Sequence, residues 1–157
     1  MSQDGNTYQG LSPDRKLHLF SFEAERFLTS IIGYSKLLSS ETQKPPLQNI
    51  LSADFVQSLD AIQQTSGKLA QLLRDIRTPE ENNPYADALI RQALAMLLNE
   101  SMTPISVMGG YGTLLKLEIQ KPDLQAYLPP RFADNLDLMQ TAITRLSKTR
   151  EELANSM

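Results

Sequence analysis

Residues 33–48 read GYSKLLSSETQKPPLQ, and residues 110–125 read GYGTLLKLEIQKPDLQ. The two stretches lie 77 positions apart, and the match extends in both directions without a gap. Between residues 17–77 and 94–154, 18 of 61 aligned pairs are identical. The repeated Gln-Lys-Pro and Leu-Gln fall where a connecting loop is expected, and helix periodicity does not dictate loop residues. The pattern predicts one structural unit used twice, with a core that the two copies share.

The composition is that of one globular domain with an aliphatic core. Of the 157 residues, 41% are hydrophobic, only 6% are aromatic and none is tryptophan, so Leu, Ile and Met must fill the interior. The formal net charge of −3 argues against a nucleic-acid partner, because phosphate binding needs a clustered basic surface. The absence of cysteine excludes disulfides and thiolate metal sites. The single histidine, without convergent carboxylates, is not a metal-ligand set. We therefore expect neither a metal nor another cofactor.

The location of the protein is predicted from its apolar runs and its first residues. No apolar run approaches the roughly 20 residues that cross a bilayer. Residues 1–10 are polar and lack the apolar centre of a signal peptide. We therefore expect a soluble, cytoplasmic protein, with residues 1–12 forming a loose N-terminal tail.

Apolar residues recur at alternating spacings of three and four, which is the period of helices packed in a bundle rather than of strands. Four such seams follow one another, and they predict an all-α fold. The first half contributes Leu17, Phe20, Ala24, Phe27, Ile31, Tyr34 and Leu38, and then Phe55, Leu59, Ile62, Ser66, Leu69, Leu73 and Ile76. The second half contributes Leu94, Leu97, Ser101, Pro104, Met108, Tyr111 and Leu115, and then Phe132, Leu136, Met139, Ile143, Leu146, Arg150 and Leu153.

Proline-containing segments separate the predicted helices. Ser12 followed by Pro13 has the form of an N-cap with proline in the first turn, and further prolines interrupt each half between its two seams. Between the halves, the capping-box pattern at 78–81 and the later Asn-Pro pair give two starts for the third helix. We expect two helical hairpins, repeat one over residues 13–77 and repeat two over residues 84–155.

Each hairpin has an apolar seam that it cannot bury alone. The two copies are therefore expected to bury each other as an antiparallel four-helix bundle that occupies residues 13–157. Gly33 and Gly110 lie inside the predicted helices, where each costs about 1 kcal/mol relative to alanine. They either permit close helix approach or mark a flexible point, and the sequence does not choose between these roles.

Two segments at matching places in the halves carry a family resemblance. Residues 27–38, FLTSIIGYSKLL, resemble the first helix of the dimerisation and histidine-phosphotransfer domain of bacterial sensor histidine kinases. The family pattern runs Ser-His-Glu-Leu-Arg-Thr-Pro-Leu-Thr-x-Ile-x-Gly-Tyr-x-x-Leu-Leu. Residues 99–111, NESMTPISVMGGY, keep its Glu, its Thr-Pro and its Gly-Tyr. The segments from Phe55 to Arg77 and from Phe132 to Leu153 resemble that domain's second helix.

The resemblance implies an unusual assembly. In the family, two such hairpins come from two chains and form a dimeric bundle. Here both hairpins lie in one chain, so the resemblance implies a pseudo-dimer closed within a monomer. A homodimer remains an alternative if the two hairpins separate.

The departures from the family pattern argue against kinase activity. The phosphoacceptor histidine of the family falls on Phe22 in the first copy and on Asn99 in the second. Neither side chain accepts a phosphoryl group as an imidazole nitrogen does. The sequence also lacks the ATP-binding domain of these kinases and a phosphate-cradling glycine-rich loop. Autophosphorylation is therefore not expected.

Glu100 and Thr103 keep the Glu-x-x-Thr spacing of the family. In the family this Glu assists phosphotransfer, and the Thr can position the water that dephosphorylates a response regulator. The resemblance thus implies a candidate phosphatase site, and the alternative is that both residues are surface remnants of ancestry. In the first copy Glu23 is retained, but Arg26 replaces the Thr, so only the second copy keeps the pair.

His18, Phe22 and Arg26 are spaced by four and so predict one outer stripe of the first helix. His18 is the only histidine, and it is either a displaced phosphoacceptor or a solvated surface residue. An exposed Phe22 would suit a partner surface. Alternatively, the helix is rotated slightly and Phe22 lies against a neighbouring helix.

These observations support three hypotheses about function. The first is a non-catalytic two-component signalling module that docks the receiver domain of a response regulator, or a histidine kinase, through Phe22, Arg26, Asn99 and Thr103. The second is a response-regulator phosphatase that uses Glu100 and Thr103. The third is a structural helical bundle with an unrelated protein partner.

Overall fold

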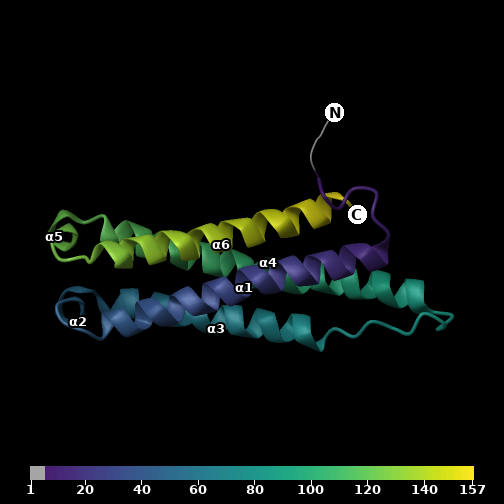
Figure 1. Cartoon of the computed structure of the whole chain (residues 1–157), viewed down its shortest axis with the longest axis horizontal. Helices are drawn as coiled ribbons and strands as arrows, with labels where there is room; N and C mark the ends of the chain where they lie inside the picture. Colours follow the sequence, from purple (N-terminus) through teal and green to yellow (C-terminus); the bar gives the residue numbers. More distant parts are fainter. Residues whose placement is uncertain (1–5) are drawn as a thin grey trace.

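The computed structural model describes residues 6–157, and this part of the chain is all-helical, as the sequence predicts (Figure 1). Four helices are long, and two helices of a single turn lie in the connections. The long helices are α1 (Pro13–Thr42), α3 (Ala53–Asp75), α4 (Ala86–Ile119) and α6 (Pro130–Asn155), and the short ones are α2 (Leu47–Ile50) and α5 (Pro122–Gln125).

The four long helices lie side by side along the long axis of the molecule (Figure 1). α1 contacts α3, α4 and α6, and α4 also contacts α3 and α6. The short helices α2 and α5 lie at the same end, whereas the connection between α3 and α4 and the C-terminus lie at the other end (Figure 1). Each connection therefore returns the chain along the helix that it has just left.

The helix starts agree with the capping signals, with one exception. The side chain of Ser12 accepts a hydrogen bond from the backbone N–H of Arg15, and Pro13 occupies the first turn of α1. Ser52 caps α3 in the same way. The exception is the capping-box pattern at 78–81, which starts no helix, because α4 begins only at Ala86.

Buried residues follow the predicted seams with a small shift. In α1, Leu28 and Ser35 are buried, while the predicted Phe27 and Tyr34 are only half-buried. A straight α-helix has 3.6 residues per turn, so a strict 3.5-residue seam drifts around it and burial passes to the next residue. Two of the seven predicted seam positions of this helix are therefore wrong by one residue.

The same correction applies to the second half of the chain. In α4, Ile105 and Gly112 are buried in place of the predicted Pro104 and Tyr111. In α6, Thr149 is buried in place of Arg150, whose guanidinium group instead donates hydrogen bonds to the backbone carbonyl of Leu98 at 2.8 and 3.1 Å. Pro104 lies inside α4 without ending it.

Burial repeats in the register in which the sequence repeats. Every buried residue of α1 has a buried counterpart in α4 77 positions later, from Leu17 and Leu94 to Thr42 and Ile119. In α3 and α6 the buried counterparts are Phe55 and Phe132, Leu59 and Leu136, Ile62 and Met139, Ser66 and Ile143, and Leu69 and Leu146.

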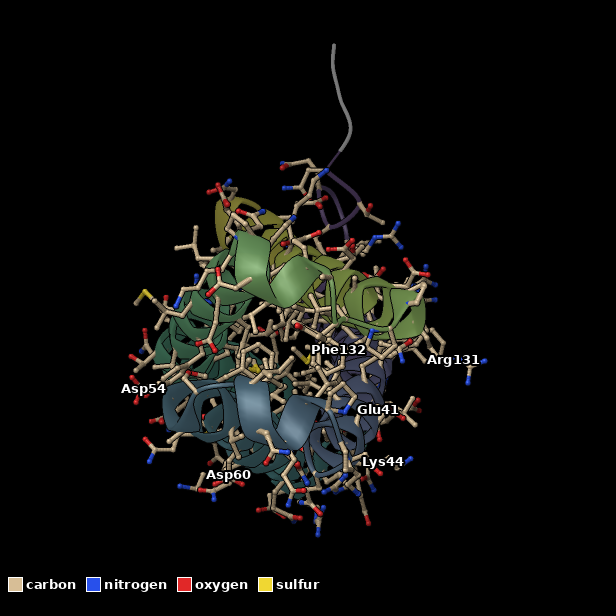
Figure 2. The ribbon with its side chains drawn as sticks, turned by 90° about the vertical axis from the view of Figure 1, so that its left-hand side faces the viewer. Glu41, Lys44, Asp54, Asp60, Arg131 and Phe132 are labelled. Carbon is tan, nitrogen blue, oxygen red and sulfur yellow. The ribbon has the colours of Figure 1, made fainter. Side chains whose placement is uncertain are left out.

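One pair of counterparts is in direct contact. The rings of Phe55 and Phe132 have centroids 5.8 Å apart and are tilted by 31°. Figure 2 views the end that carries α2 and α5, and it shows Phe132 among the side chains that fill the space between the helices. In the same view, Asp54, Asp60 and Arg131 lie at the periphery, as expected for charged groups that retain their hydration (Figure 2).

The N-terminal segment differs from the loose tail that the sequence predicts. Residues 1–5 lie outside the described residues, but from Asn6 onward the chain packs on the end of the long helices. Tyr8 is only 1% exposed and belongs to the main hydrophobic core. The side-chain amide of Asn6 donates a hydrogen bond to the backbone carbonyl of Glu152 at 2.8 Å. The ammonium group of Lys16 donates one to the backbone carbonyl of Ser156 at 2.7 Å. The segment thus joins the start of α1 to the end of α6.

The glycines answer one question that the sequence leaves open. A Cβ atom at Gly33 or Gly110 would meet no heavy atom within 4 Å, so neither glycine serves close helix approach. Gly112 does, because a Cβ there would overlap the side chain of Gln140 from α6.

A membrane span would require a long and strongly apolar helix. Among the described residues, no helix combines the necessary length and apolarity.

Candidate functional site

The outer face of α1 carries Phe22, the residue that the sequence resemblance aligns with the phosphoacceptor histidine. Phe22 is 65% exposed there, so it does not lie against a neighbouring helix. His18 and Arg26 lie one turn before and one turn after it, and both are exposed. The imidazole Nε2 of His18 is 3.6 Å from a carboxylate oxygen of Asp14, within α1 itself. His18 is therefore a solvated residue in a local pair, beside an unpartnered aromatic ring.

Arg26 connects this face to a groove between α1 and α6. Its guanidinium carbon lies 5.5 Å from the centroid of the Phe27 ring, within the range of a cation–π contact. The groove beyond it is lined by Phe27 and Tyr34 from α1, and by Leu138 and Arg145 from α6. An aromatic and aliphatic floor between two arginines can receive a side chain that is apolar or negatively charged.

The second candidate surface lies on α4. Asn99, Glu100 and Thr103 are all exposed. Glu100 and Thr103 are three residues apart on one helix, so their side chains are surface neighbours. Within the described residues, neither side chain forms a hydrogen bond or an ion pair with another side chain. The carboxylate and the hydroxyl are thus available to a partner or to water.

Glu23, the counterpart of Glu100 in the first half, differs from it in its hydrogen bonding. One of its carboxylate oxygens accepts a hydrogen bond from the hydroxyl of Tyr8 at 2.7 Å. Burial, followed by the hydrogen bond to Glu23 and its negative charge, raises the pKa of Tyr8 well above its usual range. Both halves therefore carry a glutamate at this position, but only the carboxylate of Glu23 is hydrogen-bonded to another side chain among the described residues.

The candidate residues form two surfaces and not one. Phe22 and Arg26 lie on the exposed side of α1, and Asn99 and Thr103 lie on the exposed side of α4. A partner that covers one surface need not reach the other. In the described part of the chain, no group of three or more metal-ligating side chains converges on either surface.

Three features of these surfaces were not predicted from the sequence. The groove between α1 and α6 joins helices that are remote in the sequence, and the Tyr8–Glu23 contact depends on how the first residues fold back. A third feature was readable but not recognised: α4 exposes large apolar side chains, including Val107, Leu114 and Leu117. Their spacing of seven and three residues is visible in the sequence itself.

Comparison with known proteins gives no independent identification. Neither a family model, nor a curated protein, nor a solved structure matches the chain.

Proposed function

We propose that the chain is a duplicated helical hairpin whose copies close an antiparallel four-helix bundle as an intrachain pseudo-dimer. The common burial register of α1 and α4, and of α3 and α6, supports this proposal. The contact between Phe55 and Phe132 supports it as well, because a residue meets its own counterpart only near a two-fold axis.

On this fold we propose a non-catalytic two-component signalling module that docks the receiver domain of a response regulator. The observation that carries the proposal is Phe22, an exposed aromatic ring at the position of the phosphoacceptor. Aromatic residues, phenylalanine included, are enriched in the buried core of protein interfaces. A phenyl ring has no nucleophilic atom, so the module binds its partner without phosphoryl transfer.

The effect of such a module is to occupy a partner surface. Arg26 beside Phe22 and Arg145 across the groove add positive charge around an apolar centre. A receiver domain presents an acidic phosphorylation site, and this charge pattern is complementary to it. Binding here would keep the regulator from its own kinase, or hold it at a chosen place.

A binding experiment tests the docking proposal. Receiver domains and kinases from the same genome are titrated with the full chain by isothermal calorimetry. We expect Phe22→Asp to weaken binding at least tenfold, which corresponds to about 1.4 kcal/mol. Leu37→Asp is the matched control, because Leu37 is 54% exposed on the same helix and far from Phe22, and it should leave the affinity unchanged. If none of these domains binds, the docking proposal fails.

A second candidate function follows from the availability of Glu100 and Thr103. A water positioned by Thr103 would attack the phosphorus of an aspartyl phosphate on the regulator. A new O–P bond forms, the acyl O–P bond breaks, and inorganic phosphate leaves with the regulator's carboxylate restored. Phosphate release that Thr103→Ala abolishes, and that Thr113→Ala at another exposed position of α4 leaves intact, supports the phosphatase. Binding without release leaves docking alone.

A further inference from the structure

Among the described residues, α4 exposes seven large apolar side chains, whereas α1 exposes two and α3 and α6 expose one each. We define the α4 stripe as Glu100, Thr103, Val107, Gly110, Leu114, Leu117 and Lys121. All seven are exposed, and their spacing alternates strictly between three and four. Lys121 lies two residues beyond the end of α4, as the N-cap of α5. A period of 3.5 residues describes a helix face that packs along another helix.

The α4 stripe is already complementary to itself when a second copy runs antiparallel. With the two-fold axis between Gly110 and Tyr111, Val107 of each copy lies opposite Leu114 of the other. The same register places Glu100 opposite Lys121 at both ends of the contact. The charges at the two ends are therefore opposite in sign. Between them, Gly110 lies opposite Tyr111 and Leu117 opposite Pro104. Thr103 lies opposite Glu118, whose carboxylate already accepts hydrogen bonds from Ser52.

The centre of this register is open at Gly110. A Cβ atom at Gly110 would meet no heavy atom within 4 Å, so the surface over this residue is open. Helix axes approach more closely where the side chains at the crossing are small. The stripe borders a groove between α3 and α4 that Tyr111, Leu114 and Leu117 line together with the charged Asp54, Glu118 and Lys121.

The first half of the chain provides an internal control. At the seven matched positions, α1 and the residues after it carry Glu23, Arg26, Ser30, Gly33, Leu37, Ser40 and Lys44. Serines thus replace Val107 and Leu117. Glu23 is engaged by Tyr8, and Lys44 lies 3.5 Å from Glu41 (Figure 2 labels both residues). The matched face of α1 therefore lacks both the apolar centre and the unpaired end charges of the α4 stripe.

We propose that the α4 stripe is a homodimer interface, in which two chains pair antiparallel through α4. The occupant is a second copy because self-pairing in this register places Glu100 and Lys121 against each other at both ends, and within residues 6–157 neither charge forms an ion pair with another side chain. This inference does not rest on the docking proposal, since Phe22 on α1 stays exposed in the dimer. It does cover Glu100 and Thr103, so a phosphatase site on α4 would be available only in the monomer.

Sedimentation equilibrium of the full chain tests the interface. We expect the wild type to sediment with twice the mass of one chain at high concentration and to dissociate on dilution. Leu114→Glu should raise the dissociation constant at least tenfold, because it places two carboxylates in the apolar centre. Leu37→Glu is the matched control at the counterpart position, with nearly the same exposure, 54% against 56% for Leu114. It should leave the dissociation constant unchanged, and circular dichroism checks that both variants fold.

A charge exchange tests the register independently of the apolar centre. Glu100→Lys and Lys121→Glu should each raise the dissociation constant about threefold to tenfold, and the double variant should restore it. A chain that stays monomeric at about 1 mM, the weak end of specific association, overturns the proposal. Equal effects of Leu114→Glu and Leu37→Glu, or a double variant weaker than both single variants, overturn it as well.

Discussion

At the scale of single residues, Tyr8 and Glu23 make the first half of the chain chemically different from the second. The hydroxyl of Tyr8 reaches Glu23 from the N-terminal segment, whereas Tyr85, its counterpart 77 positions later, is 71% exposed as the N-cap of α4. A hydrogen bond to a charged group contributes more than one between neutral groups, and removing one partner leaves the other to find water. The contact therefore both stabilises the start of α1 and withdraws Glu23 from any partner.

Replacing the hydroxyl of Tyr8 should destabilise the chain measurably. Tyr8→Phe keeps the buried ring and removes only the bond to Glu23, so we expect a loss of about 1–2 kcal/mol in the free energy of unfolding. Urea denaturation at neutral pH measures it. Tyr127→Phe is the control, because Tyr127 is exposed, and it should change the free energy by less than about 0.5 kcal/mol. Equal effects of the two substitutions would contradict the contact.

The raised pKa of Tyr8 predicts a dependence of stability on pH. A tyrosine whose folded pKa exceeds its unfolded value contributes stability that is complete below the unfolded pKa, about 10, and is lost as the pH rises toward the folded value. Lysines also titrate in this range, so the comparison that matters is with Tyr8→Phe. We expect the stability of the wild type to fall more steeply above about pH 10 than that of the variant. Parallel curves would show that Tyr8 is not coupled to folding.

At the scale of the helix, two glycines separate the effect of tertiary packing on α1 and α4 from the effect of helix propensity. Gly33 occupies an exposed helix position with open space where a Cβ would lie, whereas Gly112 is covered by Gln140. The carboxamide oxygen of Gln140 is buried and lacks a hydrogen-bond partner among the described residues. A side chain held over a glycine in this way is a consequence of tertiary packing, and helix propensity alone does not reveal it.

Alanine at the two glycines should therefore give different results. Gly33→Ala should raise the free energy of unfolding by roughly 0.5–1 kcal/mol, because it removes the entropy cost of glycine and meets no atom. Gly112→Ala gains the same propensity but forces Gln140 to move, so its net gain should be smaller. Thermal and urea unfolding of the two single variants measure the difference. A destabilising Gly33→Ala would instead indicate that α1 bends or is flexible at this point.

At the scale of the whole molecule, the helical seams could be predicted from the sequence because a helix records its buried side every three or four residues. Leu17, Leu38 and Phe55 were predicted as core residues and are buried. Phe27 was not placed correctly, because a 3.5-residue template drifts on a straight helix. Tyr8 could not be found, since one apolar side chain in a polar segment carries no period.

The candidate site was predictable to the same extent and for the same reason. The exposure of Phe22 and Asn99 follows from their position opposite the seam. The groove beside Arg26 and the capture of Glu23 depend on contacts between segments far apart in the sequence. The α4 stripe is an intermediate case. Its spacing can be read from the sequence, but its role as an interface depends on a second copy of the chain.

The central claim is that both hairpins of one chain share one core, and the contact of Phe55 with Phe132 tests it most directly. Nuclear Overhauser effects between the two assigned rings are measured on labelled chain diluted into an excess of unlabelled chain, so that only contacts within one chain remain. The account predicts a cross-peak that survives dilution, as the ring separation of 5.8 Å requires. A cross-peak that is absent, or that disappears on dilution, would contradict the account.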